Sequence, residues 1–156
     1  MWVACKPLGR NLARKAIAGA VPGFETYLKK GQIEILSYSE WYVKDGAFSP
    51  QRVLDGWASK LDEALSRGYD GMRVSGNTGW LEPGHWKRFM EYENRVNNVI
   101  RGSRVKAICS YPIDKCGPRE TAEVLREHRL ALSLTREKAV ARRRASSSDR
   151  SDSTRS

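Results

Sequence analysis

The stretch SPQRVLDGWASKLDEALSRGYDGMRVS, residues 49–75, decides the fold class because it passes from a helix into a strand. Ser49 can cap a helix that begins at Pro50, and Gly68 stands where a glycine commonly follows a helix end. Apolar residues recur every four positions at Val53, Trp57, Leu61 and Leu65. This spacing gives the helix one core-facing stripe, and the β-like run Met72–Ser75 follows it.

The same alternation of strands and helices extends along most of the chain. Strands are predicted at five short runs, namely Trp2–Cys5, Ile33–Tyr38, Met72–Ser75, Val105–Tyr111 and Leu130–Thr135. Helices are predicted at 9–20, 50–67, 84–101 and 118–128, with a short helical turn around Phe24, Tyr27 and Leu28. Because strands alternate with helices, the sequence predicts an α/β fold with a mostly parallel sheet flanked by helices.

Composition limits the class of protein. The chain has 156 residues, 40% of them hydrophobic and five of them Trp, which favours one folded domain of ordinary size. No apolar run reaches the roughly 20 residues that a membrane span needs. The three Cys are an odd number without metal-ligand spacing, which is typical of a reducing compartment. We therefore expect a cytoplasmic protein with no metal site and no cofactor.

The net charge of +10 is concentrated at the two ends of the chain. Residues 1–30 carry six basic and one acidic side chain, and residues 136–156 carry seven basic and three acidic ones. The residues between these two ends are nearly neutral in charge, which argues against nucleic-acid binding by the domain. The alternative function is a nucleic-acid-associated protein that uses its basic ends. We expect residues 1–135 to form the domain and residues 136–156 to be a disordered, basic tail rich in Ser and Arg.

Aromatic and polar residues follow three of the predicted strands. In a parallel sheet, ligands bind in the crevice beyond the carboxyl ends of the strands. The residues at those ends are Tyr38, Trp41 and Tyr42, then Asn77 and Trp80, then Tyr111. Aromatic rings that also carry an N–H or O–H group are typical of a small-molecule pocket. The alternative to a ligand-binding role is a structural one, in which these rings pack under loops.

Helix 84–101 carries a carboxylate in the middle of its apolar face. Glu93 lies at the centre of that face, and Asn97 lies one turn further on. A carboxylate there must be paired, hydrogen-bonded or protonated, because burial of a bare charge is too costly. Two interpretations stay open, a structural ion pair with Arg73 and a ligand-anchoring role for Glu93 and Asn97. With the residues at the strand ends, Arg73, Glu93 and Asn97 complete the predicted ligand-binding set.

The sequence offers no catalytic constellation. It has no Gly-x-x-x-x-Gly-Lys-Ser/Thr phosphate loop, which argues against a degenerate ATPase-like enzyme. His85 and His128 stand near helix ends, where surface or capping roles are typical. Cys109, inside a predicted strand, is expected to be an inert small hydrophobe, and a lowered thiol pKa is conceivable only for Cys116 at a helix start. We therefore expect no enzymatic activity.

An ordered set of short motifs resembles the MEDS domain, a sensory domain of methanogen and methylotroph signalling proteins. The motifs are Gly31-Gln-Ile-Glu-Ile, Glu40-Trp-Tyr, Gly46-x-Phe48, Gly68-Tyr-Asp-Gly-Met-Arg73, Ser75-Gly-Asn-Thr-Gly-Trp80, Tyr92-Glu93 with Asn97, and Cys109-x-Tyr111. The resemblance covers roughly residues 1–135. It implies a fold like the RecA-type ATPases without their phosphate-binding loop, and binding of a small hydrocarbon derivative. It also implies a signalling partner, such as a two-component histidine kinase or a PAS-containing protein.

The chain departs from the family pattern at two points. Family members have a further strand and helix before the segment that resembles Met1–Cys5, so the resemblance implies that the first strand and helix are missing here. A sheet that lacks a strand exposes an edge, and we therefore expect self-association. Pro112 follows Tyr111 where the family commonly has an acidic residue.

Overall fold

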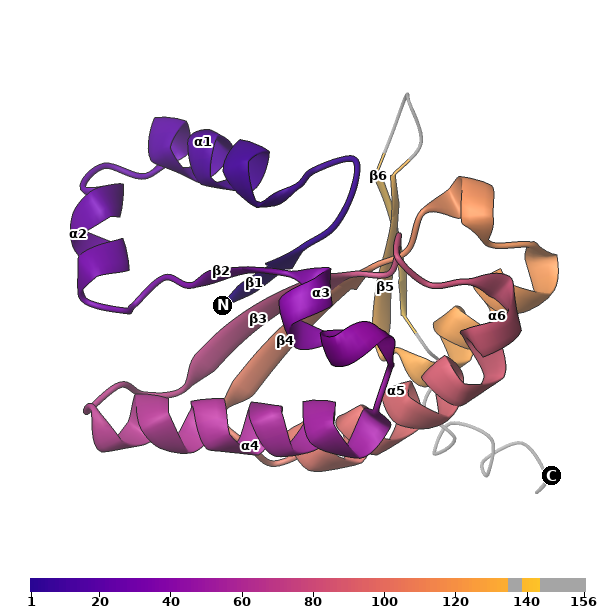
Figure 1. Cartoon of the computed structure of the whole chain (residues 1–156). Coiled ribbons are helices and arrows are strands. Elements are labelled where there is room, and N and C mark those ends of the chain that lie inside the picture. Colours follow the sequence, from indigo (N-terminus) through magenta and orange to yellow (C-terminus); the bar gives the residue numbers. More distant parts are fainter. Residues whose placement is uncertain (135–138, 144–156) are drawn as a thin grey trace, which may run out of the picture. The chain divides into compact units, whose positions relative to one another are not determined.

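The computed structural model describes residues 1–134 and 139–143 of the chain. The chain divides into two compact units, Met1–Lys115 and Cys116–Ser156. Figure 1 shows the course of the chain through the elements of each unit.

The first unit is built on a four-stranded, wholly parallel sheet. Its strands are β1 (Trp2–Ala4), β2 (Ile35–Ser37), β3 (Met72–Asn77) and β4 (Val105–Ser110), in the order β2-β1-β3-β4. Its helices are α1 (Arg10–Ala20), α2 (Phe24–Lys29), α3 (Tyr38–Trp41), α4 (Pro50–Ser66) and α5 (Trp86–Ile100), with 3-10 turns at Lys44–Gly46, Pro83–His85 and Ile113–Lys115. The predicted α/β class, with a parallel sheet flanked by helices, is confirmed.

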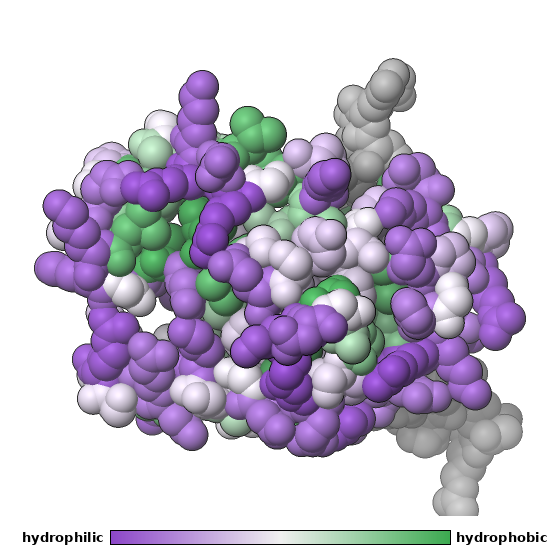
Figure 2. Space-filling view, viewed as in Figure 1, coloured by the Kyte–Doolittle hydropathy of each residue, from purple (hydrophilic) through white to green (hydrophobic). Residues whose placement is uncertain are grey.

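Helices cover both faces of this sheet, so the first unit has two hydrophobic clusters. Strand side chains alternate between faces. Val3 and Val74 therefore pack in the larger cluster with α4 and α5, whereas Ala4 and Ile35 pack in the smaller one with α1 and α2 (Figure 1). In Figure 2, polar and charged side chains cover most of the visible face, and apolar ones show between α1 and α2.

The predicted ends of α4 are confirmed by their capping contacts. The Arg52 N–H donates to the Ser49 side chain, Pro50 is the first helical residue, and Gly68 has a φ of +80° just beyond the end. The predicted strand Ile33–Tyr38 is shorter than expected. It ends at Ser37 because Ser37 and Glu40 form a capping box that starts the short helix α3.

The second unit contains α6 (Pro118–Glu127) and an antiparallel pair, β5 (Leu130–Leu134) and β6 (Ala139–Arg143). The fifth predicted strand thus belongs to a separate two-stranded sheet and not to the parallel one. β6 lies in the segment 136–156, for which the sequence predicts a disordered tail. Ala-Val-Ala is the least polar part of that segment and pairs with β5. Disorder of the tail stays a prediction.

The remainder of the expected tail, residues 136–138 and 144–156, lies outside the described residues. Within the described ranges, no helix is both long enough and apolar enough to cross a membrane.

Candidate functional site

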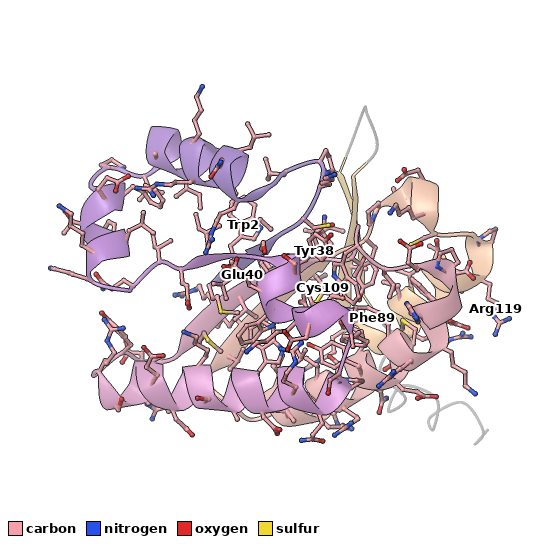
Figure 3. All side chains as sticks on the ribbon, viewed as in Figure 1. Trp2, Tyr38, Glu40, Phe89, Cys109 and Arg119 are labelled. Atoms are coloured by element: carbon pink, nitrogen blue, oxygen red, sulfur yellow. The ribbon has the colours of Figure 1, made fainter. Side chains whose placement is uncertain are left out.

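A set of buried polar side chains lies inside the larger hydrophobic cluster of the first unit. We call it the Glu93 cluster and define it as Tyr42, Tyr92, Glu93, Cys109 and Tyr111. The centre is Glu93, whose exposed fraction is only 4%. Glu93 is on the buried face of α5 because it follows Phe89 by one helical turn, and the side chains of i and i+4 share a face. Figure 3 shows Phe89 and Cys109 near the same end of the sheet.

Two protonated groups from one segment of chain lie beside the Glu93 carboxylate. They are the Cys109 thiol and the Tyr111 hydroxyl, and both are near enough for the carboxylate to raise their pKa values. Burial raises the pKa of the Cys109 thiol and of the Tyr111 hydroxyl well above their usual values, and the nearby Glu93 carboxylate raises both further. Both groups therefore keep their protons at neutral pH.

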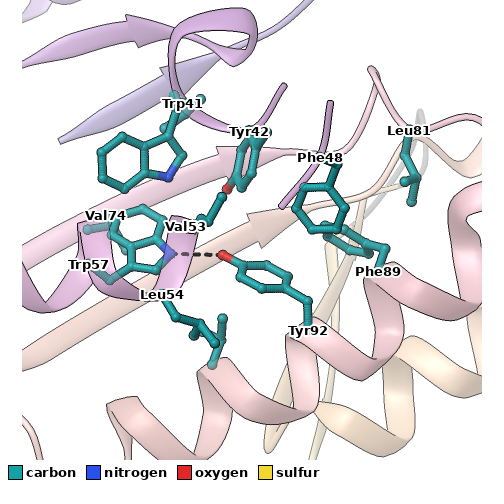
Figure 4. Packing of buried hydrophobic residues seen from close by; sticks show 12 residues of the cluster. Trp41, Tyr42, Phe48, Val53, Leu54, Trp57, Val74, Leu81, Phe89 and Tyr92 are labelled. Carbon is teal, nitrogen blue, oxygen red and sulfur yellow. Dashed lines mark hydrogen bonds between the residues drawn. The ribbon is translucent and has the colours of Figure 1, made fainter. Parts of the chain in front are cut away.

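The two other tyrosines of the cluster are also held in the neutral state. Burial raises the pKa of Tyr42 well above 10.0, with smaller contributions from Tyr92, Cys109 and Glu93. Burial likewise raises the pKa of Tyr92, although the hydrogen bond from Trp57 opposes this shift. That bond, from Trp57 Nε1 to Tyr92 Oη, measures 2.8 Å and is buried (Figure 4).

Aromatic rings wall the cluster. The Tyr42 ring stacks on Trp80 with centroids 5.1 Å apart, and Phe48 lies 5.3 Å from Trp80. Phe89 meets Trp80 edge-on at 5.9 Å and Tyr111 at 6.5 Å. Offset and edge-to-face pairs at such distances stabilise beyond the area they bury. The polar groups thus lie in surroundings that are mainly aromatic.

Two glycines allow the rings to approach the backbone. A Cβ at Gly76 in β3 would lie 2.5 Å from Tyr42 Oη, and a Cβ at Gly56 in α4 would lie 2.9 Å from the Trp41 ring. Glycine is thus required at both positions because the aromatic side chains occupy the space of a methyl group.

Two indole N–H groups at this site are buried without a described acceptor. Trp41 Nε1 and Trp80 Nε1 have no hydrogen-bond partner among the described residues. A buried Trp N–H usually finds a partner. An acceptor atom of a bound small molecule fits this arrangement.

The structure brings most of the predicted site residues to one place. Tyr42, Glu93 and Tyr111 belong to the cluster itself, and Trp80 stacks on Tyr42. Trp41 is buried in the same hydrophobic cluster, and the half-buried Tyr38 packs against it. Asn97 is half-buried on α5, one turn after Glu93.

Two predicted residues lie elsewhere. Arg73 precedes the core residue Val74 and so points to the opposite face of β3, where it is exposed. It makes no ion pair within the described ranges, so the interpretation of a Glu93–Arg73 pair is wrong. Asn77 organises the turn after β3: its Oδ1 accepts from Gly79 N at 2.7 Å, and its Nδ2 donates to Ser110 Oγ at 3.1 Å.

Sequence reasoning did not place Tyr92 or Cys109 among the site residues. The expectation that Cys109 is an inert small hydrophobe agrees with its raised thiol pKa, although the residue lies beside the Glu93 carboxylate. One signal was present, because Cys109 and Tyr111 are two residues apart at the end of a strand and so share a face. Tyr92 appeared only within the family motif Tyr92-Glu93, and its bond to Trp57 had no local signal, since the two residues are 35 apart.

Comparisons with known proteins identify the family. The family model described as "MEthanogen/methylotroph, DcmR Sensory domain", abbreviated MEDS, matches residues 1–129. Neither the curated proteins nor the solved structures gave a match. The match covers most of the chain, including every residue of the Glu93 cluster, and the chain therefore belongs to the MEDS family of sensory domains.

Proposed function

We propose that this chain is a ligand-sensing domain without catalytic activity, and that it binds a small hydrocarbon derivative at the Glu93 cluster. Membership of a sensory family supports the sensing role. The observation that carries the site is a carboxylate, 4% exposed, that lies among aromatic rings beside the protonated Tyr111 and Cys109. Protein sites for small molecules combine apolar walls with a few placed polar groups in this way.

The space near the cluster suits a ligand of a few heavy atoms. A hollow of about 120 Å³ lies between α4 and α5 and is lined by mainly apolar residues, among them Leu54, Trp57, Leu61, Val96 and Ile100. An apolar cavity of about 150 Å³ is known to hold benzene. Trp57 links this hollow to the cluster, because its ring lines the hollow and its Nε1 donates to Tyr92.

A sensory domain acts through an output partner. We propose a histidine kinase or a PAS-containing signalling protein as this partner, because sensory domains of two-component systems act through such proteins. Ligand binding would change which hydrogen bonds the Glu93 cluster makes, and a partner that binds one arrangement better would shift the population toward it.

The test of ligand binding is a thermal-shift series with methanol, methylamine, 1-butanol and chloroform at sub-denaturing concentrations. We expect at least one compound to raise the Tm of the parent in a saturable way, because a ligand that binds only the native state stabilises it. Trp80→Phe removes the buried Nε1 donor and keeps a ring, so this variant should lose most of the shift. Trp2→Phe, which alters a Trp outside the Glu93 cluster, should keep it.

A saturable shift that is equal in the parent, Trp80→Phe and Trp2→Phe would place the binding site elsewhere. Absence of any saturable shift across the series would contradict the proposed class of ligand.

A further inference from the structure

A second hollow lies at the amino ends of the parallel strands, away from the Glu93 cluster. Its volume is about 880 Å³, and its lining includes residues just before or at the start of β1, β2, β3 and β4. Figure 2 shows the surface hollowed on the left, between the end of α2 and the end of α4. The volume is in the range of small-molecule sites, about 300–1,000 Å³.

One wall of this hollow has balanced charges. Lys60 on α4 forms ion pairs with Glu34 at 2.9 Å and with Glu63 at 3.5 Å. Arg67 forms an ion pair with Glu63 at 3.6 Å, and its guanidinium also lies over the Tyr69 ring. These side chains satisfy one another, so this wall leaves little charge for a ligand.

The rest of the lining has an excess of positive charge. Arg73 on β3 and Lys106 on β4 are direct partners in the register of the two strands. Adjacent strands are only about 4.8 Å apart, and like charges directly opposite each other are destabilising. Arg104, just before β4, lines the same hollow. All three side chains are exposed, and none makes an ion pair within residues 1–134 and 139–143.

The lining as a whole is also cationic. Among the described residues, five basic and three acidic side chains line the hollow, a balance of +2, and of those three acidic residues only Asp70 lies outside the paired wall. A concave surface with charge of one sign concentrates the field and attracts counter-ions. The juxtaposed Arg73 and Lys106 would be relieved of their repulsion by an anion that contacts both.

We propose that this hollow is a binding site for a phosphate-bearing small molecule, with Arg73, Arg104 and Lys106 as its anion contacts. A guanidinium presents paired N–H groups that match phosphate oxygens, and Lys adds a point charge. The site is independent of the ligand proposed for the Glu93 cluster, because Arg73 and Glu93 lie on opposite faces of the sheet. The domain would thus read two chemical signals, one apolar and one anionic.

The test compares the parent with Arg73→Gln/Lys106→Gln and with the control Lys15→Gln/Lys87→Gln. The control removes the same net charge from two exposed lysines that do not line the hollow. Sodium phosphate is titrated against sodium chloride at equal ionic strength, and Tm is followed. We expect a saturable rise for the parent and the control. In Arg73→Gln/Lys106→Gln the apparent affinity should fall about tenfold or more, since each lost charge-assisted hydrogen bond weakens binding strongly.

A second readout is the stability without phosphate at low ionic strength. Arg73→Gln/Lys106→Gln should melt at or above the parent, because an unfavourable pair of like charges is gone. A variant that melts well below the parent would show that the two cations are structural and would overturn the proposal. So would a phosphate response that does not saturate, or one that the variant and the control share equally.

Discussion

Phe89→Ala should lower the free energy of unfolding by about 3–5 kcal/mol, because removal of a fully buried Phe loses its transfer free energy and leaves a cavity. Phe89 has an exposed fraction of 2% and lies where four aromatic contacts meet. Its ring lies between 5.7 and 6.5 Å from those of Trp80, Phe48, Tyr92 and Tyr111. These four rings cannot move in to fill the cavity without losing their contacts with other side chains.

Urea unfolding followed by circular dichroism measures this loss. Leu12→Ala is the matched control, because Leu12 is 56% exposed on α1 and its truncation should change the free energy of unfolding by less than about 0.5 kcal/mol. A loss below about 1 kcal/mol for Phe89→Ala would mean that the aromatic wall is not the packed centre of the first unit.

The second large effect is a steep loss of stability at alkaline pH. Tyr42 and Tyr92 have native pKa values raised well above 10.0, chiefly by burial, whereas the unfolded chain ionises its tyrosines near 10.0. Above that pH the unfolded state binds fewer protons than the native state, so the stability falls as pH rises. Each of these tyrosines contributes about 1.4 kcal/mol per pH unit, or about 3 kcal/mol per pH unit for the pair. Tyr111 and Cys109, whose pKa values burial also raises, add to the slope. Below pH 10 the contribution of the tyrosines is fully present.

Urea unfolding at a series of pH values between about 8.5 and 11 measures the slope. Tyr42→Phe removes one of these groups and should reduce the slope by about 1.4 kcal/mol per pH unit. Tyr27→Phe, at a position 39% exposed on α2, should leave it unchanged. Identical slopes in the parent and Tyr42→Phe would show that the Tyr42 hydroxyl reaches solvent in the native state.

The elements of the parallel sheet could be predicted from the sequence because their signals are local. The cap at Ser49, the proline at the start of α4 and the glycine after it fix that helix within a few residues. The helix α3 was not predicted. Its capping box directly follows an apolar run, and that run predicts a strand that extends to Tyr38. The pairing of β5 with β6 could not be predicted, because no periodic pattern in the sequence indicates which strand β5 pairs with.

The candidate site could be predicted only in part. Its composition depends on which face of the sheet each strand residue points to and on contacts between residues far apart in the sequence. Glu93 stood out because a carboxylate interrupts an apolar helix face, and the structure buries it. One of the two open interpretations paired Arg73 with Glu93, but its neighbour Val74 faces the core and so turns Arg73 away. The bond between Trp57 and Tyr92 joins two helices whose contact no local pattern specifies.

The central claim is that Glu93 serves ligand binding more than folding. The most direct measurement compares Glu93→Gln with the control Glu91→Gln, an exposed position on the same helix. Each protein is melted alone and with the compound of the series that most stabilises the parent. Gln keeps the shape and an acceptor oxygen, so Glu93→Gln should melt within a few degrees of the parent and yet lose most of the ligand shift. A Glu93→Gln protein that melts normally and responds to the compound as fully as the parent and Glu91→Gln would contradict the account.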